Sequence, residues 1–126
     1  MIRGTTAQFK FEIPYAKSEL YWATMSFWQP GNNNLSTIIK NLSHCEGSDD
    51  SHELYVSLTV PETLQFSEKY KGKVQFRAQC IDGTVFGSRP KLFTVYPMQD
   101  EVVEEYPELP AVQNHWVVFD GGKVSE

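Results

Sequence analysis

The sequence predicts an all-β fold, an antiparallel immunoglobulin-like β-sandwich followed by an extended C-terminal arm. Aromatic residues make up 13% of the 126 residues, and aromatic side chains favour strands. Apolar and polar residues alternate in several short segments, which is the period of a strand with one buried face. Turn-forming residues separate these segments at short intervals, without a long helical period, as is typical of a sandwich.

The chain divides by charge into a body at residues 1–97 and an arm at residues 98–126. The body holds ten Lys and Arg against nine Asp and Glu, whereas the arm holds one Lys against seven acids. Their net charges of +1 and −6 together give the formal charge of −5. A chain of this length fits one domain with its own core. Because no concentrated Lys and Arg face is visible, we expect no nucleic-acid partner.

The first two strands are predicted at residues 8–13 and 20–28. In the first, Phe9, Phe11 and Ile13 alternate with polar residues and predict one buried face. The second carries aromatic residues on both faces, which indicates a central strand. Its two predicted faces are Tyr21, Ala23, Met25 and Phe27 on one side, and Leu20, Trp22, Thr24, Ser26 and Trp28 on the other.

The middle of the chain alternates turns with shorter segments. The cluster at residues 30–34 predicts a hairpin turn, because Gly and Asn tolerate positive φ. Residues 35–45 are expected to form a strand, with a short helix as the alternative. Residues 54–60 alternate again and predict a strand. Residues 61–66 predict a crossing turn, with one helical turn that begins at its proline.

The last strands of the body are predicted at residues 74–80, 84–86 and 92–96. Asp82-Gly83 between the first two is a strong hairpin signal, because both residues accept positive φ. Residues 87–90 contain Gly and Pro and predict a break in the pairing before the last strand. About seven strands result, as expected for an immunoglobulin-like sandwich.

The C-terminal arm combines an acidic linker with a short apolar strand. Residues 99–110 are acidic and interrupted by proline, which predicts an extended linker. The strand-forming run is Trp116, Val117, Val118 and Phe119. Such a run needs a partner, so it either folds back on its own sandwich or adds to the sheet edge of a neighbouring subunit. We favour the neighbouring subunit, because this suits assembly on a symmetric particle.

No signal peptide or membrane span is expected, because the chain has no apolar leader and no apolar stretch near 18 residues. Synthesis in the cytoplasm follows as an expectation, and there Cys45 and Cys80 are interpreted as buried thiols rather than a disulfide. One cluster has metal-binding residue types: His44, Cys45, Glu46, Asp49, Asp50 and His52. Its spacing matches no established zinc pattern, so we expect a solvated loop without metal.

No catalytic or cofactor-binding residues are assigned, and we expect no cofactor and no enzyme activity. The sequence contains no nucleophile elbow, no Gly-rich phosphate loop and no HExxH motif. Trp22 and Trp28 are candidate surface aromatics, since a sugar ring stacks well on a flat aromatic face. The alternative for both residues is packing within the sandwich.

Six segments of the body form a distinctive set: the opening Met-Ile-Arg-Gly-Thr-Thr, Ile13-Pro14 at the end of the first strand, Cys45 before a strand, Leu58-Thr59 to Phe66, the strand start at Gly72 to Gln75, and Asp82-Gly83-Thr84. Together they resemble a family of small proteins encoded by bacteriophages and prophages of gut bacteria. The resemblance covers roughly residues 1–103. The end of the arm, Trp116 to Gly122, is also similar to the V-x-DGG tails of some phage structural proteins.

The resemblance implies a non-enzymatic virion structural protein, an immunoglobulin-like attachment module of the capsid, neck or tail. Its expected partners are other virion proteins and further copies of itself, bound through sheet edges and the arm. Its expected location is the virion, after synthesis in the bacterial cytoplasm. The alternative function is a carbohydrate-binding or adhesion module that recognises a host surface.

Overall fold

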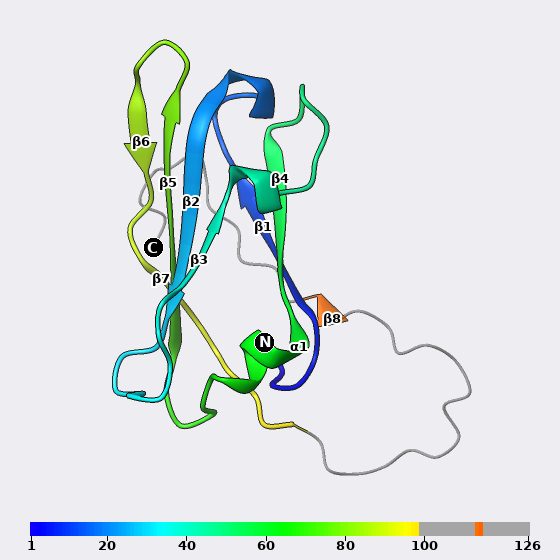
Figure 1. The fold of residues 1–126 in the computed structure, drawn as a ribbon, viewed down its shortest axis with the longest axis vertical. Coiled ribbons are helices and arrows are strands. Elements are labelled where there is room, and N and C mark those ends of the chain that lie inside the picture. The colour runs from blue at the N-terminus through cyan, green and yellow to red at the C-terminus, as the bar shows by residue number, and fades with distance from the viewer. Residues whose placement is uncertain (99–112, 115–126) are drawn as a thin grey trace, which may run out of the picture.

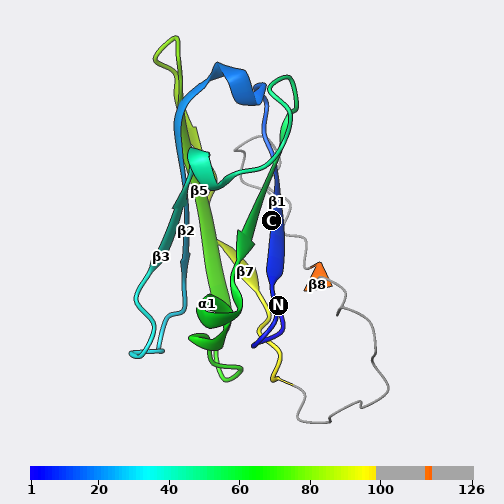
Figure 2. The same cartoon turned by 45° about the vertical axis from the view of Figure 1, so that its right-hand side comes forward.

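Two layers of β-sheet form the body in the computed structural model, which describes residues 1–98 and 113–114 (Figures 1 and 2). One sheet has three strands in the order β4 (Glu53–Leu58), β1 (Ala7–Glu12) and β8 (Gln113–Asn114). The other has five: β3 (Ile38–Asn41), β2 (Leu20–Trp28), β5 (Gly72–Cys80), β6 (Val85–Gly87) and β7 (Lys91–Phe93). Within the second sheet, β6 and β7 pair with successive parts of β5.

All strand pairs are antiparallel except the short pairing of β1 with β8. The chain passes between the layers at each of the connections β1 to β2, β3 to β4 and β4 to β5. The prediction of an all-β antiparallel sandwich is therefore confirmed. Its immunoglobulin-like topology stays a prediction, as does the domain boundary after residue 97.

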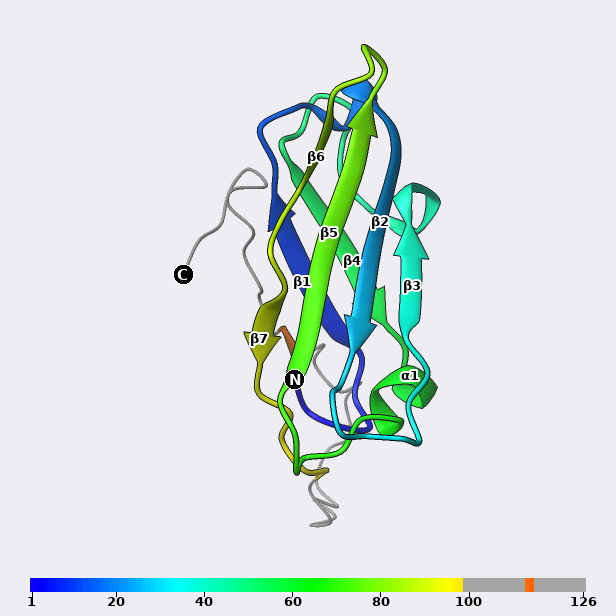
Figure 3. The ribbon, with the colours of Figure 1, turned by 90° about the vertical axis from the view of Figure 1, so that its left-hand side faces the viewer.

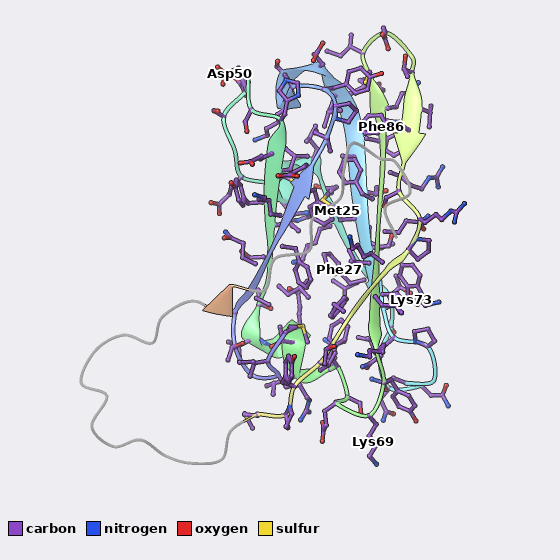
Figure 4. All side chains as sticks on the ribbon, turned by 180° about the vertical axis from the view of Figure 1, so that it is seen from behind. Met25, Phe27, Asp50, Lys69, Lys73 and Phe86 are labelled. Atoms are coloured by element: carbon purple, nitrogen blue, oxygen red, sulfur yellow. The ribbon has the colours of Figure 1, made fainter. Side chains whose placement is uncertain are left out.

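The core lies between the two layers and is built on phenylalanine. Alternation buries Phe9 and Phe11 on β1, Phe27 on β2 and Phe76 on β5, each with no exposed surface. Phe9 crosses the gap between the sheets, because its ring centroid lies 5.0 Å from that of Phe27. Phe11 makes the equivalent contact with Phe76 at 5.6 Å. Figure 4 shows Met25 and Phe27 of β2 pointing into this space.

The strand β2 has the predicted bounds, but one part of its predicted face assignment is wrong. Ala23, Met25 and Phe27 are buried as expected, whereas Tyr21 is 73% exposed and Leu20 is buried. The register of β2 against β5 shifts between Leu20 and Trp22. A bulge of this kind changes the side on which neighbouring residues point, and alternation in the sequence does not reveal it.

Two segments differ in length or type from their predictions. Residues 35–45 contain both expected alternatives, because β3 is followed by the short 3₁₀ helix η2 (Leu42–His44). The Asn41 side chain accepts a hydrogen bond from the Ser43 amide at 3.0 Å and so starts this turn. The strand predicted at 92–96 ends at Phe93 in β7, and Tyr96 instead forms an isolated parallel bridge with Ile2.

The helical turn predicted within residues 61–66 is present as α1 (Val60–Leu64) and closes one end of the core (Figure 1). Thr59 caps it, since its amide donates to Glu62 Oε1 at 2.8 Å and its hydroxyl accepts from the Glu62 amide at 3.4 Å. This reciprocal pair is a capping box. Glu62 also pairs with Lys40 Nζ at 2.9 Å, which joins α1 to the edge strand β3. A second 3₁₀ helix, η1 (Lys17–Glu19), leads into β2 at the other end.

Replacing Phe9 by alanine should lower the free energy of unfolding by about 3 to 5 kcal/mol, because it leaves a cavity between the sheets. Ser57→Ala, on the outward side of β4, is the control and should change stability by less than about 0.5 kcal/mol. Urea denaturation followed by circular dichroism measures both. Equal effects of the two substitutions would contradict the inter-sheet position of Phe9.

Residues 1–98 should fold without the arm, because every buried hydrophobic residue of the described chain lies between Met1 and Val95. The arm contributes to the described sheets only the two-residue strand β8. A chain ending at residue 98 should therefore lose no more than about 1 kcal/mol of stability. Thermal unfolding of the two chains side by side measures the difference, and a truncated chain without a cooperative transition would contradict this expectation.

Candidate interaction face

The outer side of the five-stranded sheet carries an unusual set of side chains for a solvent-facing surface. Cross-strand register identifies its members, because residues opposite one another in a sheet point to the same side. The outward residues are Trp22, Thr24, Ser26 and Trp28 of β2, Ile39 and Asn41 of β3, Lys73, Gln75, Arg77 and Gln79 of β5, Val85 of β6 and Leu92 of β7. We call this surface the outer face; Figure 3 views it with β5 in front.

Aliphatic exposure is concentrated on and beside the outer face. Ile39 is 61% exposed, Val85 57% and Leu92 58%. Among described large hydrophobic residues, the only others more than half exposed are Tyr21 and Ile81, which lie in β2 and directly after β5. Ile39, Val85 and Leu92 lie on three different strands, with β2 and β5 between the first and the other two, so the outer face carries dispersed apolar side chains rather than one continuous patch.

The outward side of the three-stranded sheet differs sharply from the outer face. Lys10 of β1 lies 3.4 Å from carboxylate oxygens of both Glu12 and Glu53. The Tyr55 hydroxyl donates to Glu53 at 2.8 Å. These contacts lower the pKa of Glu53, first through the Tyr55 hydrogen bond and then through Lys10. The polar groups on this sheet are thus paired with one another. The side chains of Ile39, Val85 and Leu92, which are more than half exposed, lie instead on the outer face.

Trp22 and Trp28 both lie on the outer face, partly exposed, as the candidate surface aromatics of the sequence. The indole nitrogen of Trp22 donates to Gln79 Oε1 at 2.8 Å, which holds its ring across the strand β5. Trp28 stands opposite Lys73. The two residues are six positions apart on one strand, or about 20 Å, so they form two separate platforms.

The charged residues of the outer face are all cations. Lys73 and Arg77 point outward from β5, and none of the outward strand residues is Asp or Glu. Neither cation forms an ion pair within residues 1–98. Figure 4 shows Lys73 on the side of the sheet away from the core. Residues 71–91 as a whole hold five Lys and Arg against the single acid Asp82.

The arm meets the body through the strand β8. Gln113 and Asn114 pair in parallel with Ala7 and Gln8 of β1, on the edge of β1 that faces away from β4. This pairing lies within one chain and just precedes the predicted partner-binding run. The predicted partner-binding residues Trp116, Val117, Val118 and Phe119 lie outside the described residues.

The potential metal ligands near Cys45 do not converge. His44 Nδ1 accepts a hydrogen bond from the Asn41 amide at 3.1 Å, and His52 Nδ1 lies 3.3 Å from the Ile13 carbonyl oxygen. Cys45 Sγ points inward and lies 3.5 Å from Met25 Sδ. Within the described residues, no group of three His, Cys, Asp or Glu side chains is placed to hold a metal ion.

Both cysteines are free and buried, as predicted: Cys45 is 7% exposed and Cys80 3%. Burial raises the pKa of the Cys45 thiol to about 11, although the nearby Lys17 acts in the opposite direction. Burial also raises the pKa of Cys80. Neither thiol has the lowered pKa of a nucleophilic cysteine.

Two shallow hollows lie at opposite ends of the sandwich. One, of about 280 Å³, is lined by residues that include Tyr15, Glu19 and Asp82. The other, of about 250 Å³, lies beside α1. There the Arg3 guanidinium donates to the Leu64 carbonyl oxygen at 3.1 Å and lies 3.7 Å from Glu68, so its charge serves to fix the loop.

Comparison with known proteins gives no family assignment: no family model matches the chain, and no curated protein matches it. Among the helices in residues 1–98 and 113–114, none is long and apolar enough to cross a membrane.

In the folded protein, Cys45 should react slowly with a thiol reagent at pH 8, because a pKa of about 11 leaves on the order of one thiol in a thousand ionised. The rate should rise about tenfold for each pH unit up to the pKa. Addition of denaturant should expose the thiol and remove this protection. Kinetics with an aromatic disulfide reagent on a Cys80→Ala chain would measure it, and rapid reaction at pH 8 without denaturant would contradict the burial of Cys45.

Proposed function

We propose that this chain is a non-enzymatic attachment protein of a bacteriophage particle, which joins other virion proteins through its sheet edges and C-terminal arm. The observation that supports this proposal most directly is the addition of Gln113–Asn114 to the edge of β1. An arm that extends a sheet by backbone hydrogen bonds can tie two subunits together with little demand on side-chain identity.

The connection between body and arm permits this exchange. Residues 99–112 join Met98 to β8 and, fully extended, would span at most about 50 Å. That length is more than a return to its own β1 requires, so the same strand can reach the β1 of a neighbouring copy. Exchange of an identical element between copies is a low-cost route to oligomers.

The proposed partners are capsid, neck or tail subunits, together with further copies of this chain. The outer face supports an attachment role as well, because a partner can bury its exposed Ile39, Val85 and Leu92 side chains. The resemblance of residues 1–103 to small phage and prophage proteins directs the proposal to the virion, after synthesis in the bacterial cytoplasm.

Removing residues 99–126 should abolish incorporation into particles of the encoding phage while the body stays folded. The reason is that the arm supplies the strand that a neighbouring sheet edge receives. A chain in which residues 113–119 are replaced by Gly and Ser keeps the arm length and should fail in the same way. Immunoblotting of purified particles measures incorporation, and normal levels of the truncated chain would refute the role of the arm.

The second candidate function is a carbohydrate-binding or adhesion module, which the outward position of Trp22 and Trp28 supports. A sugar ring needs a flat apolar surface bordered by polar groups, and Gln79 and Thr24 lie beside Trp22. Ile39, Val85 and Leu92 favour a protein partner instead, since exposed aliphatic side chains offer a sugar little. Glycan-array binding by the monomer that is lost in Trp28→Ala would favour the carbohydrate function.

A further inference from the structure

We propose that the outer face binds the acidic segment at residues 99–112 of a second copy of this chain. This inference rests on the proposed attachment function and names one surface that receives the arm. The terminal strand would then add to a sheet edge, while the acidic segment before it covers the exposed apolar and cationic side chains.

Residues 99–112 and the outer face carry opposite charges. Residues 99–112 contain five carboxylates and no Lys or Arg. The outer face contributes Lys73 and Arg77 and no outward carboxylate. Opposite charges on the two surfaces favour their encounter and exclude competing partners. Face-to-face packing of two outer faces would instead bring only cations together, which disfavours that form of dimer.

The charges on the outer face and on residues 99–112 also have matching spacings. Lys73 and Arg77 are four residues apart on one strand, a separation of about 13 Å. Asp100 and Glu104 are also four residues apart, so in an extended peptide they have the same separation and point to the same side. Two ion pairs can therefore form together, on either side of Gln75, which lies between the two cations on β5.

Residues 99–112 and the outer face both carry apolar side chains in addition to their charges. The segment contains Val102, Val103, Tyr106, Leu109 and Val112 in addition to its acids. The outer face exposes more than half of Ile39, Val85 and Leu92. Burying these groups against each other supplies the favourable free energy that surface ion pairs alone provide only weakly.

The positions of the two ends of the segment favour a second copy over the same chain. Met98 packs beside Gly4, three residues before β1, and β8 pairs with β1 itself. Both ends therefore lie at the start of β1, in the layer opposite to the outer face. Figure 2 shows β8 and β3 on opposite sides of the sandwich. Met98, where residues 99–112 begin, therefore lies in the layer opposite to the outer face of the same chain, which favours the outer face of a second copy.

The test uses charge reversal on the full chain. Arg77→Glu should weaken self-association about tenfold, because it replaces an attraction to the acidic segment by a repulsion. Lys69→Glu is the matched control: it changes charge equally on an exposed loop residue away from the outer face. Sedimentation velocity over a range of concentrations measures both variants, and circular dichroism checks that each is folded.

A synthetic peptide of residues 99–112 tests the identity of the occupant. Its fluorescence anisotropy should rise on binding to the full chain and to residues 1–98, more weakly at high salt and about tenfold more weakly to Arg77→Glu. Leu92→Ser should also weaken binding, whereas Val60→Ser, at an exposed residue of the helix α1 rather than of the five-stranded sheet, should not. A poly-glutamate peptide of equal length should bind more weakly.

Equal effects of Arg77→Glu and Lys69→Glu, absence of peptide binding, or equally tight poly-glutamate binding would each overturn the inference. Failure of the inference is distinguishable from failure of the proposed function. If truncation of residues 99–126 abolishes particle incorporation while Arg77→Glu and Leu92→Ser chains are incorporated normally, the attachment role stands and the outer face is not the receiving surface.

Discussion

The packing of phenylalanine across the two sheets is the constraint on which the rest of this structure depends. Phe9 contacts Phe27 and also Phe93, with ring centroids 5.0 and 5.3 Å apart. Phe93 in turn packs over Gly72, where a Cβ atom would clash with its ring. These contacts place Phe9 of β1, Phe27 of β2 and Phe93 of β7 on the inward sides of their strands. The opposite side of each sheet is left to meet solvent or a partner.

The two outward surfaces that result have different chemistry. On the three-stranded sheet, Lys10, Glu53 and Tyr55 satisfy one another, as expected for a surface adapted to water. On the five-stranded sheet, aliphatic side chains stand beside Lys73 and Arg77 without a neighbouring outward carboxylate. The two layers therefore differ in what they present outward: the three-stranded sheet presents paired polar groups, and the five-stranded sheet presents exposed aliphatic side chains and cations.

Much of the fold was predictable from local sequence, but the candidate face was predictable only in part. Trp22 and Trp28 were identified as candidate surface residues because they stand out in any strand. Ile39, Val85 and Leu92 carried no such signal, since single aliphatic residues in short strands are as often buried as exposed. Their shared surface depends on the pairing of β3, β6 and β7 with β2 and β5, and alternation within one strand contains no information about its neighbours. The bulge that turns Tyr21 outward was missed for the same reason.

The sequence by itself determined the all-β class, the main strands, the helical turn within residues 61–66 and the burial of both cysteines, because each depends on local periodicity or on residue chemistry. It also determined the separation of an almost neutral body from an acidic arm. Only the tertiary structure decided which side of each strand is covered, which edge β8 occupies and which exposed residues lie together. These features depend on contacts between residues far apart in the chain, such as Gly72 with Phe93 and Ala7 with Gln113, and only the folded chain brings such residues together.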